Sequence, residues 1–170
     1  HGDGPLADVL TSSLRCSGAR INHTVRTHAS AGAADLAVLT DYLVADPRVV
    51  RDLHAAGTAH LPVRVRDGTG LVGPLVIPGV TSCLRCADLH RSDRDPAWPA
   101  IATQLSRTVG SADRATILGT AALALREIHH VLRAQPGGAP PATLDTTLEF
   151  DVEAGEVAAR RWSRHPHCEC

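Results

Sequence analysis

The sequence contains no lysine and no methionine, and aromatic residues make up only 2% of its 170 residues. Without lysine, every fixed positive side chain is an arginine, and the formal net charge is only −1. A nearly neutral chain attracts nucleic acid and anionic membrane surfaces only weakly, so neither is expected as a partner. With so few aromatic side chains, the core must consist mainly of alanine, leucine and valine.

Long apolar runs are also missing, so the sequence predicts no transmembrane helix and shows no secretory signal. A length of 170 residues predicts one domain that spans residues 1–170. The chain opens at His1 without methionine, and we expect a longer polypeptide upstream of it. Four of the five cysteines form two close pairs, which fits a cytoplasmic metal protein better than a secreted disulfide scaffold.

The two cysteine pairs are Cys83-Leu84-Arg85-Cys86 near the middle of the chain and Cys168-Glu169-Cys170 at its end. Four thiolates complete a tetrahedral zinc site with no open position, so the expected metal is structural. Such a site would tie the C-terminal tail to the middle of the fold. His165 and His167 are alternative ligands.

Two further cysteine interpretations remain beside the zinc site. A redox role for the first pair is disfavoured, because no helix is predicted directly after it, as a thioredoxin-like motif requires. Cys16 stands apart from both pairs, and we expect it to be a small buried residue on a helix rather than a reactive thiol.

The N-terminal stretch Gly2-Asp3-Gly4-Pro5-Leu6-Ala7 has the spacing of a glycine-rich turn that opens a helix and binds phosphate. We predict that this helix covers residues 5–17. The apolar run 34–40 predicts a buried strand that ends at Asp41, where ligands bind in open α/β sheets. Asp41 could contact a ligand or Mg²⁺, or it could serve a turn or a helix N-cap.

The rest of the chain alternates strands and helices. Predicted strands cover residues 21–27, 60–65, 71–77, 146–152 and 156–162; predicted helices cover 46–57, 100–107 and 112–134, the last capped by Ser111. Residues 60–77 and 146–162 form hairpins. The polar segment 88–99, which contains Trp98, is expected to be a solvated loop or a docking surface.

This order of motifs resembles the ThiF/MoeB/HesA superfamily, the ubiquitin-activating type of adenylating enzyme. The parallels are the glycine-rich turn, the strand that ends at Asp41, the CxxC pair, the long helix, the late hairpin and the terminal cysteine pair. The resemblance implies a Rossmann-like α/β fold with a mostly parallel sheet that lacks its first strand, a C-terminal β-hairpin and a four-cysteine zinc site. It also implies a homodimer. An active member would bind Mg-ATP through Gly2, Gly4 and Asp41, with Arg48 or Arg51 on the phosphates.

Within the superfamily, residues 72–79, the CxxC pair and residues 89–99 look most like an actinobacterial branch. That branch resembles the ThiF-like component of cyclodehydratases that make thiazole/oxazole-modified microcins. In those systems, the resemblance implies, the domain holds zinc and helps to bind the leader peptide, while a partner carries out the ATP chemistry.

Departures from the adenylating pattern decide between the functions. Asp41 is followed by Tyr42 rather than asparagine, and there is no lysine for the phosphates. The leading expectation is therefore a non-catalytic, zinc-stapled scaffold that binds a peptide or protein partner. The alternatives are an ATP-dependent enzyme that activates the C-terminus of a small carrier protein, and a purely structural or regulatory zinc protein.

Overall fold

The computed structural model describes residues 1–25, 34–135 and 137–170. At its centre is a five-stranded sheet with the order β1-β2-β3-β4-β5. The strands are β1 (Ala37–Thr40), β2 (His60–Arg66), β3 (Thr69–Val72), β4 (Thr146–Asp151) and β5 (Glu156–Arg161). Helix α2 (Pro47–Ala55) connects β1 to β2, and these two strands are parallel.

The mixed α/β class and the C-terminal hairpin are confirmed, but the sheet is mostly antiparallel rather than mostly parallel as expected. The β2–β3, β3–β4 and β4–β5 pairs are all antiparallel. The one parallel pair among the described strands is joined through α2, as a parallel pair needs a crossover connection. The longer helical connection between β3 and β4 returns the chain antiparallel. The turn at Asp67 and Gly68, both with positive φ, reverses the chain directly.

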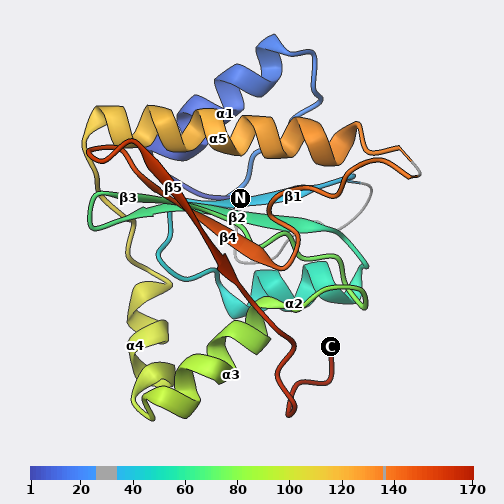
Figure 1. Ribbon diagram of the computed structural model, residues 1–170, viewed down its shortest axis with the longest axis vertical. Coiled ribbons are helices and arrows are strands. Elements are labelled where there is room, and N and C mark those ends of the chain that lie inside the picture. Colours follow the sequence, from blue (N-terminus) through green and yellow to red (C-terminus); the bar gives the residue numbers. More distant parts are fainter. Residues whose placement is uncertain (26–33, 136) are drawn as a thin grey trace.

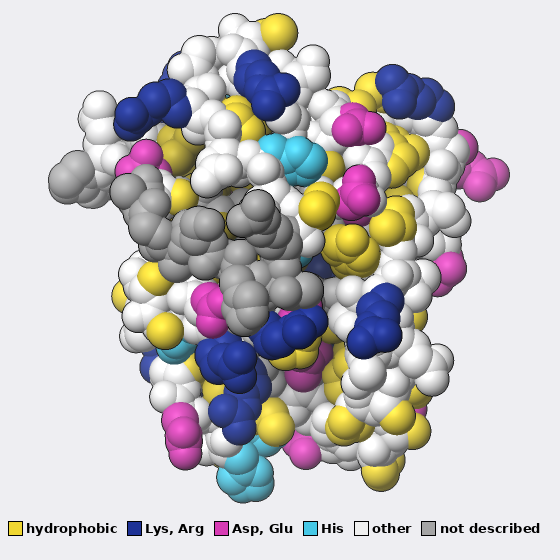
Figure 2. All heavy atoms as spheres, turned by 180° about the vertical axis from the view of Figure 1, so that it is seen from behind, with side chains coloured by type: hydrophobic (Ala, Val, Ile, Leu, Met, Phe, Trp, Pro, Cys, Tyr) yellow, Lys and Arg dark blue, Asp and Glu magenta, His cyan; other side chains and the backbone are white. Residues whose placement is uncertain are grey.

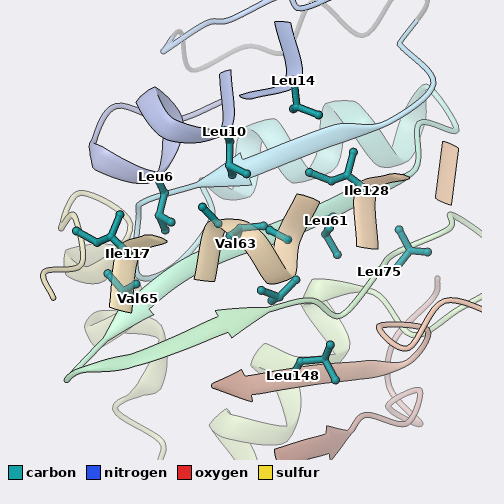
Figure 3. Close-up of a cluster of buried hydrophobic side chains, with 13 residues drawn as sticks. Leu6, Leu10, Leu14, Leu61, Val63, Val65, Leu75, Ile117, Ile128 and Leu148 are labelled. Atoms are coloured by element: carbon teal, nitrogen blue, oxygen red, sulfur yellow. The ribbon is translucent and has the colours of Figure 1, made fainter. Parts of the chain in front are cut away.

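The helices cover both faces of the sheet. Figure 1 shows α1 (Pro5–Cys16) and α5 (Arg114–Leu132) on one face, with α2, α3 (Leu84–Arg94) and α4 (Trp98–Leu105) on the other. The main core lies beneath α1 and α5, and Figure 3 shows leucine, isoleucine and valine side chains filling it. Its largest buried members are aliphatic, as the shortage of aromatic residues predicts: Leu6, Leu10, Leu14, Leu61, Val63, Val65, Val72, Leu75, Ile117, Ile128 and Leu148.

Helix ends follow simple capping chemistry. Pro5 occupies the first turn of α1, where a backbone N–H is not needed. Asp46 caps α2, as predicted, by accepting a 2.8 Å hydrogen bond from the Arg48 amide. Helix α5 is capped by Asp113 instead of Ser111, because the Asp113 carboxylate accepts from the amides of the second and third helical residues.

Three local predictions need correction. Residues 88–94, expected in a loop, belong to helix α3, whose two buried residues are too few to produce a helical apolar pattern. Residues 21–25 form no strand, and the rest of the predicted strand 21–27 lies outside the described residues. Cys16 is exposed at the end of α1 rather than buried. Among the described helices, none has the length and apolar content needed to cross a membrane.

Candidate metal centre and adjoining cavity

The first cysteine pair sits where the chain enters α3. Cys83 occupies the N-cap position, and Cys86 lies one turn into the helix. The turn before the pair is fixed by Asp145, whose carboxylate accepts hydrogen bonds from the Ser82 amide at 2.8 Å and hydroxyl at 2.9 Å. A helix therefore does follow the CxxC motif directly, contrary to the prediction that disfavoured a redox pair.

The second cysteine pair meets the first. The sulfur of Cys83 lies 3.8 Å from that of Cys86 and 3.6 Å from that of Cys168, and the sulfurs of Cys86 and Cys170 are 3.3 Å apart. All four sulfurs lie within 4.8 Å of one another. Four thiolates bound at about 2.3 Å in a tetrahedron stand about 3.8 Å apart, so these residues can hold one metal ion. The predicted meeting of the two pairs is confirmed.

The four thiols differ in their electrostatic surroundings. Burial raises the pKa of the Cys83 thiol and of the Cys170 thiol. Burial also acts to raise the pKa of Cys86, but hydrogen bonds from the backbone of His165 and Cys83 outweigh it and set this pKa at about 7. Cys86 is thus ionised more readily than Cys83 and is suited to bind the ion first.

This difference predicts how metal binding depends on pH. Because Cys86 has a pKa of about 7, binding should release one more proton per ion below neutral pH than above it. Calorimetric titration of the metal-free protein at about pH 6 and about pH 8, each in two buffers of different ionisation enthalpy, measures the number. Equal proton release at both pH values would contradict the lowered pKa of Cys86.

The C-terminal tail is held beside the cysteines by His165, which is buried. Its Nδ1 accepts from the His167 amide at 3.1 Å, so Nε2 carries the proton and donates to the Asp93 carboxylate at 2.8 Å. This hydrogen bond lowers the pKa of Asp93. The ring also packs edge-on against His90, with centroids 4.7 Å apart.

Both histidines that were alternative ligands therefore lie outside the sulfur cluster. His165 instead forms a second group with His90 and Asp93, whose candidate ligand atoms lie within 4.8 Å of one another. The hydrogen bonds of His165 account for both of its ring nitrogens. The group is best understood as the anchor of the tail.

The predicted nucleotide residues Gly2, Gly4 and Asp41 do come together at the start of α1. Asp41 is buried, and its two carboxylate oxygens accept hydrogen bonds from the amides of Leu6 at 2.9 Å and Ala7 at 3.1 Å. A Cβ atom on Gly4 would lie 2.7 Å from the Asp41 Oδ1, so glycine permits this close approach. The helix amides that would bind a phosphate are occupied by a carboxylate of the chain itself.

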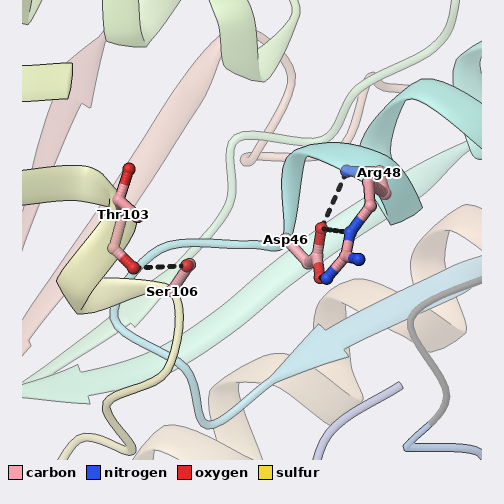
Figure 4. A network of polar contacts seen from close by, with 4 residues as sticks. All are labelled: Asp46, Arg48, Thr103 and Ser106. Atoms are coloured by element: carbon pink, nitrogen blue, oxygen red, sulfur yellow. Dashed lines mark hydrogen bonds and ion pairs between the residues drawn. The ribbon is translucent and has the colours of Figure 1, made fainter. Parts of the chain in front are cut away.

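Arg48 and Arg51, the two arginines predicted to contact phosphate, have different surroundings. Arg48 pairs with Asp46 on the surface, with 2.9 Å between Nη2 and Oδ2, and this hydrogen bond raises the pKa of the guanidinium. Figure 4 shows the pair at the start of α2. Arg51 lies on α2 and lines a cavity on the side of the metal centre. The structure therefore does not gather both arginines around Asp41.

Comparison with known proteins identifies solved structures that share this fold. No family model and no curated protein matches the sequence. Solved structures do match its fold: E. coli MccB with ATP aligns at a TM-score of 0.55 and 18% identity, over 79% of this chain and 38% of MccB. A heterocyclase in complex with substrate and cofactor aligns at a TM-score of 0.67 and 18% identity, over 96% of this chain and 23% of the heterocyclase. The chain has a ThiF-like fold.

The predicted resemblance is confirmed at the level of the fold, which is what a likeness at 18% identity establishes. The microcin C7 biosynthetic enzyme MccB has also been solved in complex with N-formylated MccA, and that structure aligns at a TM-score of 0.56 and 18% identity, over 79% of this chain and 40% of MccB. The chain thus spans well under half the length of these proteins.

A cavity of about 550 Å³ adjoins the metal centre on the α2–α3 side of this ThiF-like sheet. Its walls come from the sheet, both helices and the tail, and they include Arg64, Arg91 and Trp162. These three residues carry no motif that marks them as a site in the sequence. The available signal was an arginine at position 64 directly between two valines, Val63 and Val65, in a predicted strand.

Charges on the described surface are mixed. On the face that Figure 2 shows, dark blue arginines are interspersed with magenta carboxylates and yellow apolar side chains. Interspersed charges produce little long-range field, which agrees with a net charge of −1.

Proposed function

We propose that this chain is a non-catalytic scaffold of ThiF-like fold that binds a peptide or protein partner. The observation that carries the proposal is the position of Asp41. Its carboxylate occupies the first free amides of α1, where an adenylating enzyme would hold nucleotide phosphate. Phosphate would have to displace a buried, doubly hydrogen-bonded carboxylate of like charge.

The metal in this proposal is a structural zinc ion. A four-thiolate set leaves no coordination position for water or substrate, so it supports folding rather than hydrolysis or activation. The four ligands, Cys83, Cys86, Cys168 and Cys170, come from two segments far apart in the sequence. Zinc would join the last residues of the chain to α3. Thiolate ligation also fits a reducing cytoplasm.

The partner in this proposal is a peptide, of the kind that a peptide-modifying enzyme receives through a leader segment. MccB has been solved with N-formylated MccA and the heterocyclase with its substrate, and both share this fold. Together with the cavity beside the metal centre, these complexes support a peptide-binding role. We also propose that the chain forms a homodimer, as the superfamily resemblance implies.

A second function, ATP-dependent adenylation, is favoured by one observation: MccB of the same fold has been solved with ATP. In this chain Gly2, Gly4 and Asp41 would hold Mg-ATP, and Arg48 or Arg51 would contact the phosphates. Asp41 would first have to leave the α1 amides. A purely structural zinc protein is the third function, and it predicts neither nucleotide nor peptide binding.

Peptide binding is tested with an array of labelled peptides that covers the polypeptides encoded beside the gene for this chain. We expect saturable binding of at least one peptide to the zinc-loaded full-length protein, measured by fluorescence anisotropy. Removal of zinc should abolish it, because metal binding and folding are coupled. An array without any binding peptide would contradict the proposed function.

A further inference from the structure

Four arginines line the cavity beside the metal centre, and Arg64 is the one that is shielded from solvent without a hydrogen bond or ion pair among the described residues, since Arg51 and Arg85 are exposed. Arg64 lies in β2 between Val63 and Val65, which pack in the core, so its side chain extends from the opposite face of the sheet. Within the described part of the chain, Arg64 makes no hydrogen bond or ion pair. Burial lowers the pKa of Arg64 to about 10, and the nearby Arg91 and Arg66 add to the effect. Asp88 and Glu149 attract the guanidinium and act to raise this pKa, but neither forms a hydrogen bond or ion pair with it. A partly dehydrated guanidinium without a directly bonded carboxylate is a costly arrangement.

Another of the cavity's arginines, Arg91, is fully engaged. Arg91 forms an ion pair with Asp88 at 3.0 Å, and its guanidinium carbon lies 4.9 Å from the ring centre of Trp98 and 5.0 Å from that of Trp162. Each tryptophan is held in turn by a hydrogen bond, from Trp98 to Asp88 and from Trp162 to Thr147. Arg91 is therefore part of a rigid wall, and Arg64 receives only a through-space attraction from Asp88 and Glu149.

The remaining walls suit a peptide side chain. Apolar surface comes from Val50, Pro74 and Leu84, and the cavity volume of about 550 Å³ lies in the range of small-ligand sites. Four arginines and two carboxylates line the cavity. Cys83, Cys168 and Cys170 line it too, and a four-thiolate zinc site carries two net negative charges, so the charges around the zinc-loaded cavity balance and Arg64 offers a local positive charge. The carboxylates, Asp88 and Glu169, disfavour a ligand that carries two or more negative charges in one group.

We infer that this cavity binds a single carboxylate group of the peptide or protein partner, and that Arg64 is the residue that pairs with it. The planar guanidinium can hold a carboxylate through two parallel hydrogen bonds. The apolar walls would contact the residues on either side of the acidic one. This inference rests on the proposed peptide-binding function and adds to it the class of residue that is recognised.

If Arg64 awaits an external partner, its charge should destabilise the free protein, whereas an arginine with a partner inside the protein would stabilise it. Arg64→Met removes the dehydrated charge and keeps an apolar stem of similar length, so it should raise the melting temperature by roughly 2–4 °C. Arg66→Met is the matched control, because Arg66 points from the same face of β2 but is exposed. It should leave the melting temperature unchanged.

The binding test uses two end-capped pentapeptides with a central glutamate or glutamine between leucines, titrated into the zinc-loaded full-length protein. We expect the glutamate peptide to bind about tenfold more tightly than the glutamine peptide, the usual effect of one charge-assisted hydrogen-bond pair. Arg64→Met should abolish this preference, Arg66→Met should keep it, and Arg64→Lys should keep part of it. A glutamine peptide with a free C-terminus that regains tight binding would identify a chain-end carboxylate as the source.

Several outcomes would overturn the inference. Equal binding of the two peptides to the wild-type protein, or a preference that survives in Arg64→Met, would overturn it and leave peptide binding intact. Binding of neither peptide would count against both the inference and the proposed function. A lower melting temperature for Arg64→Met, or competition by inorganic phosphate stronger than by acetate at equal ionic strength, would also overturn it. If Arg64→Met does not fold, the Arg64→Lys titration decides.

Discussion

Replacing Cys83 and Cys86 together by serine is expected to release the bound metal and to lower the melting temperature by roughly 10–20 °C. The expected loss of stability is about 5 kcal/mol or more, because structural zinc contributes its binding free energy to folding. The effect should concentrate in α3 and the C-terminal tail, since their sulfur ligands are the groups that lose the ion. Thermal unfolding followed by circular dichroism, with metal content measured on the same samples, provides the test.

Cys16→Ser is the matched control for this experiment. Cys16 is exposed and lies outside the sulfur cluster, so its replacement should change neither metal content nor melting temperature. Hydrogen exchange should localise the loss in the double variant, with faster exchange in α3 and little change in α1. A double variant that melts like the wild-type protein would show that the cysteine cluster does not stabilise this fold.

Asp41→Ala is expected to have the second largest effect, a destabilisation of roughly 3 kcal/mol. The substitution removes a buried acceptor and leaves the amides of Leu6 and Ala7 without a partner at the start of α1. The melting temperature should fall by roughly 6–12 °C. The melting temperature of Asp41→Asn should lie between those of the wild-type protein and Asp41→Ala, because asparagine retains one acceptor oxygen and tolerates the positive φ of this position.

The control is Asp46→Ala, which removes the N-cap of α2 near the surface and should cost only about 1 kcal/mol. The two variants together compare the loss of a buried helix cap, Asp41, with the loss of a cap near the surface, Asp46. If Asp41 instead served Mg-ATP, its replacement would abolish adenylation and leave stability near that of the wild-type protein. A stable Asp41→Ala protein would therefore contradict the capping role that supports the proposed scaffold function.

Local chemistry explains which elements could be predicted from the sequence. Helix α2 was predictable because Asp46 and Pro47 mark its start, and the β2–β3 hairpin was predictable because Asp67 and Gly68 favour positive φ. Helix α5 has an apolar face wide enough to show its period. The four cysteines were predictable as one cluster because metal ligation restricts their residue type and spacing.

The missed features depend on contacts between distant segments. Helix α3 buries only Cys86 and Ala87, so its polar sequence resembles a loop until the metal centre and the tail are in place. Asp41 caps a helix that begins 36 residues earlier than itself. No local pattern shows which helix end a distant carboxylate will reach. The same applies to Arg64: only the folded structure shows that no described side chain forms a hydrogen bond or ion pair with it.

The position of Asp41 connects the fold to the proposed function. An open helix N-terminus attracts phosphate because its amides are free and its dipole favours negative charge. In this chain the Asp41 carboxylate already accepts hydrogen bonds from these amides and places a negative charge at the positive end of the helix dipole. The amides at the start of α1 are therefore used inside the protein, where they stabilise the fold. In the proposed scaffold, the cavity beside the metal centre would be the place that binds an external group.

The most direct test of this account is the titration of Mg-ATP into the full-length natural protein by calorimetry, with pyrophosphate exchange assayed on the same zinc-loaded sample. We expect no saturable heat of binding and no exchange above a protein-free blank, while peptide binding is retained. Tight Mg-ATP binding together with pyrophosphate exchange would contradict it. Such a result would identify an activating enzyme in which Asp41 leaves the α1 amides when nucleotide binds.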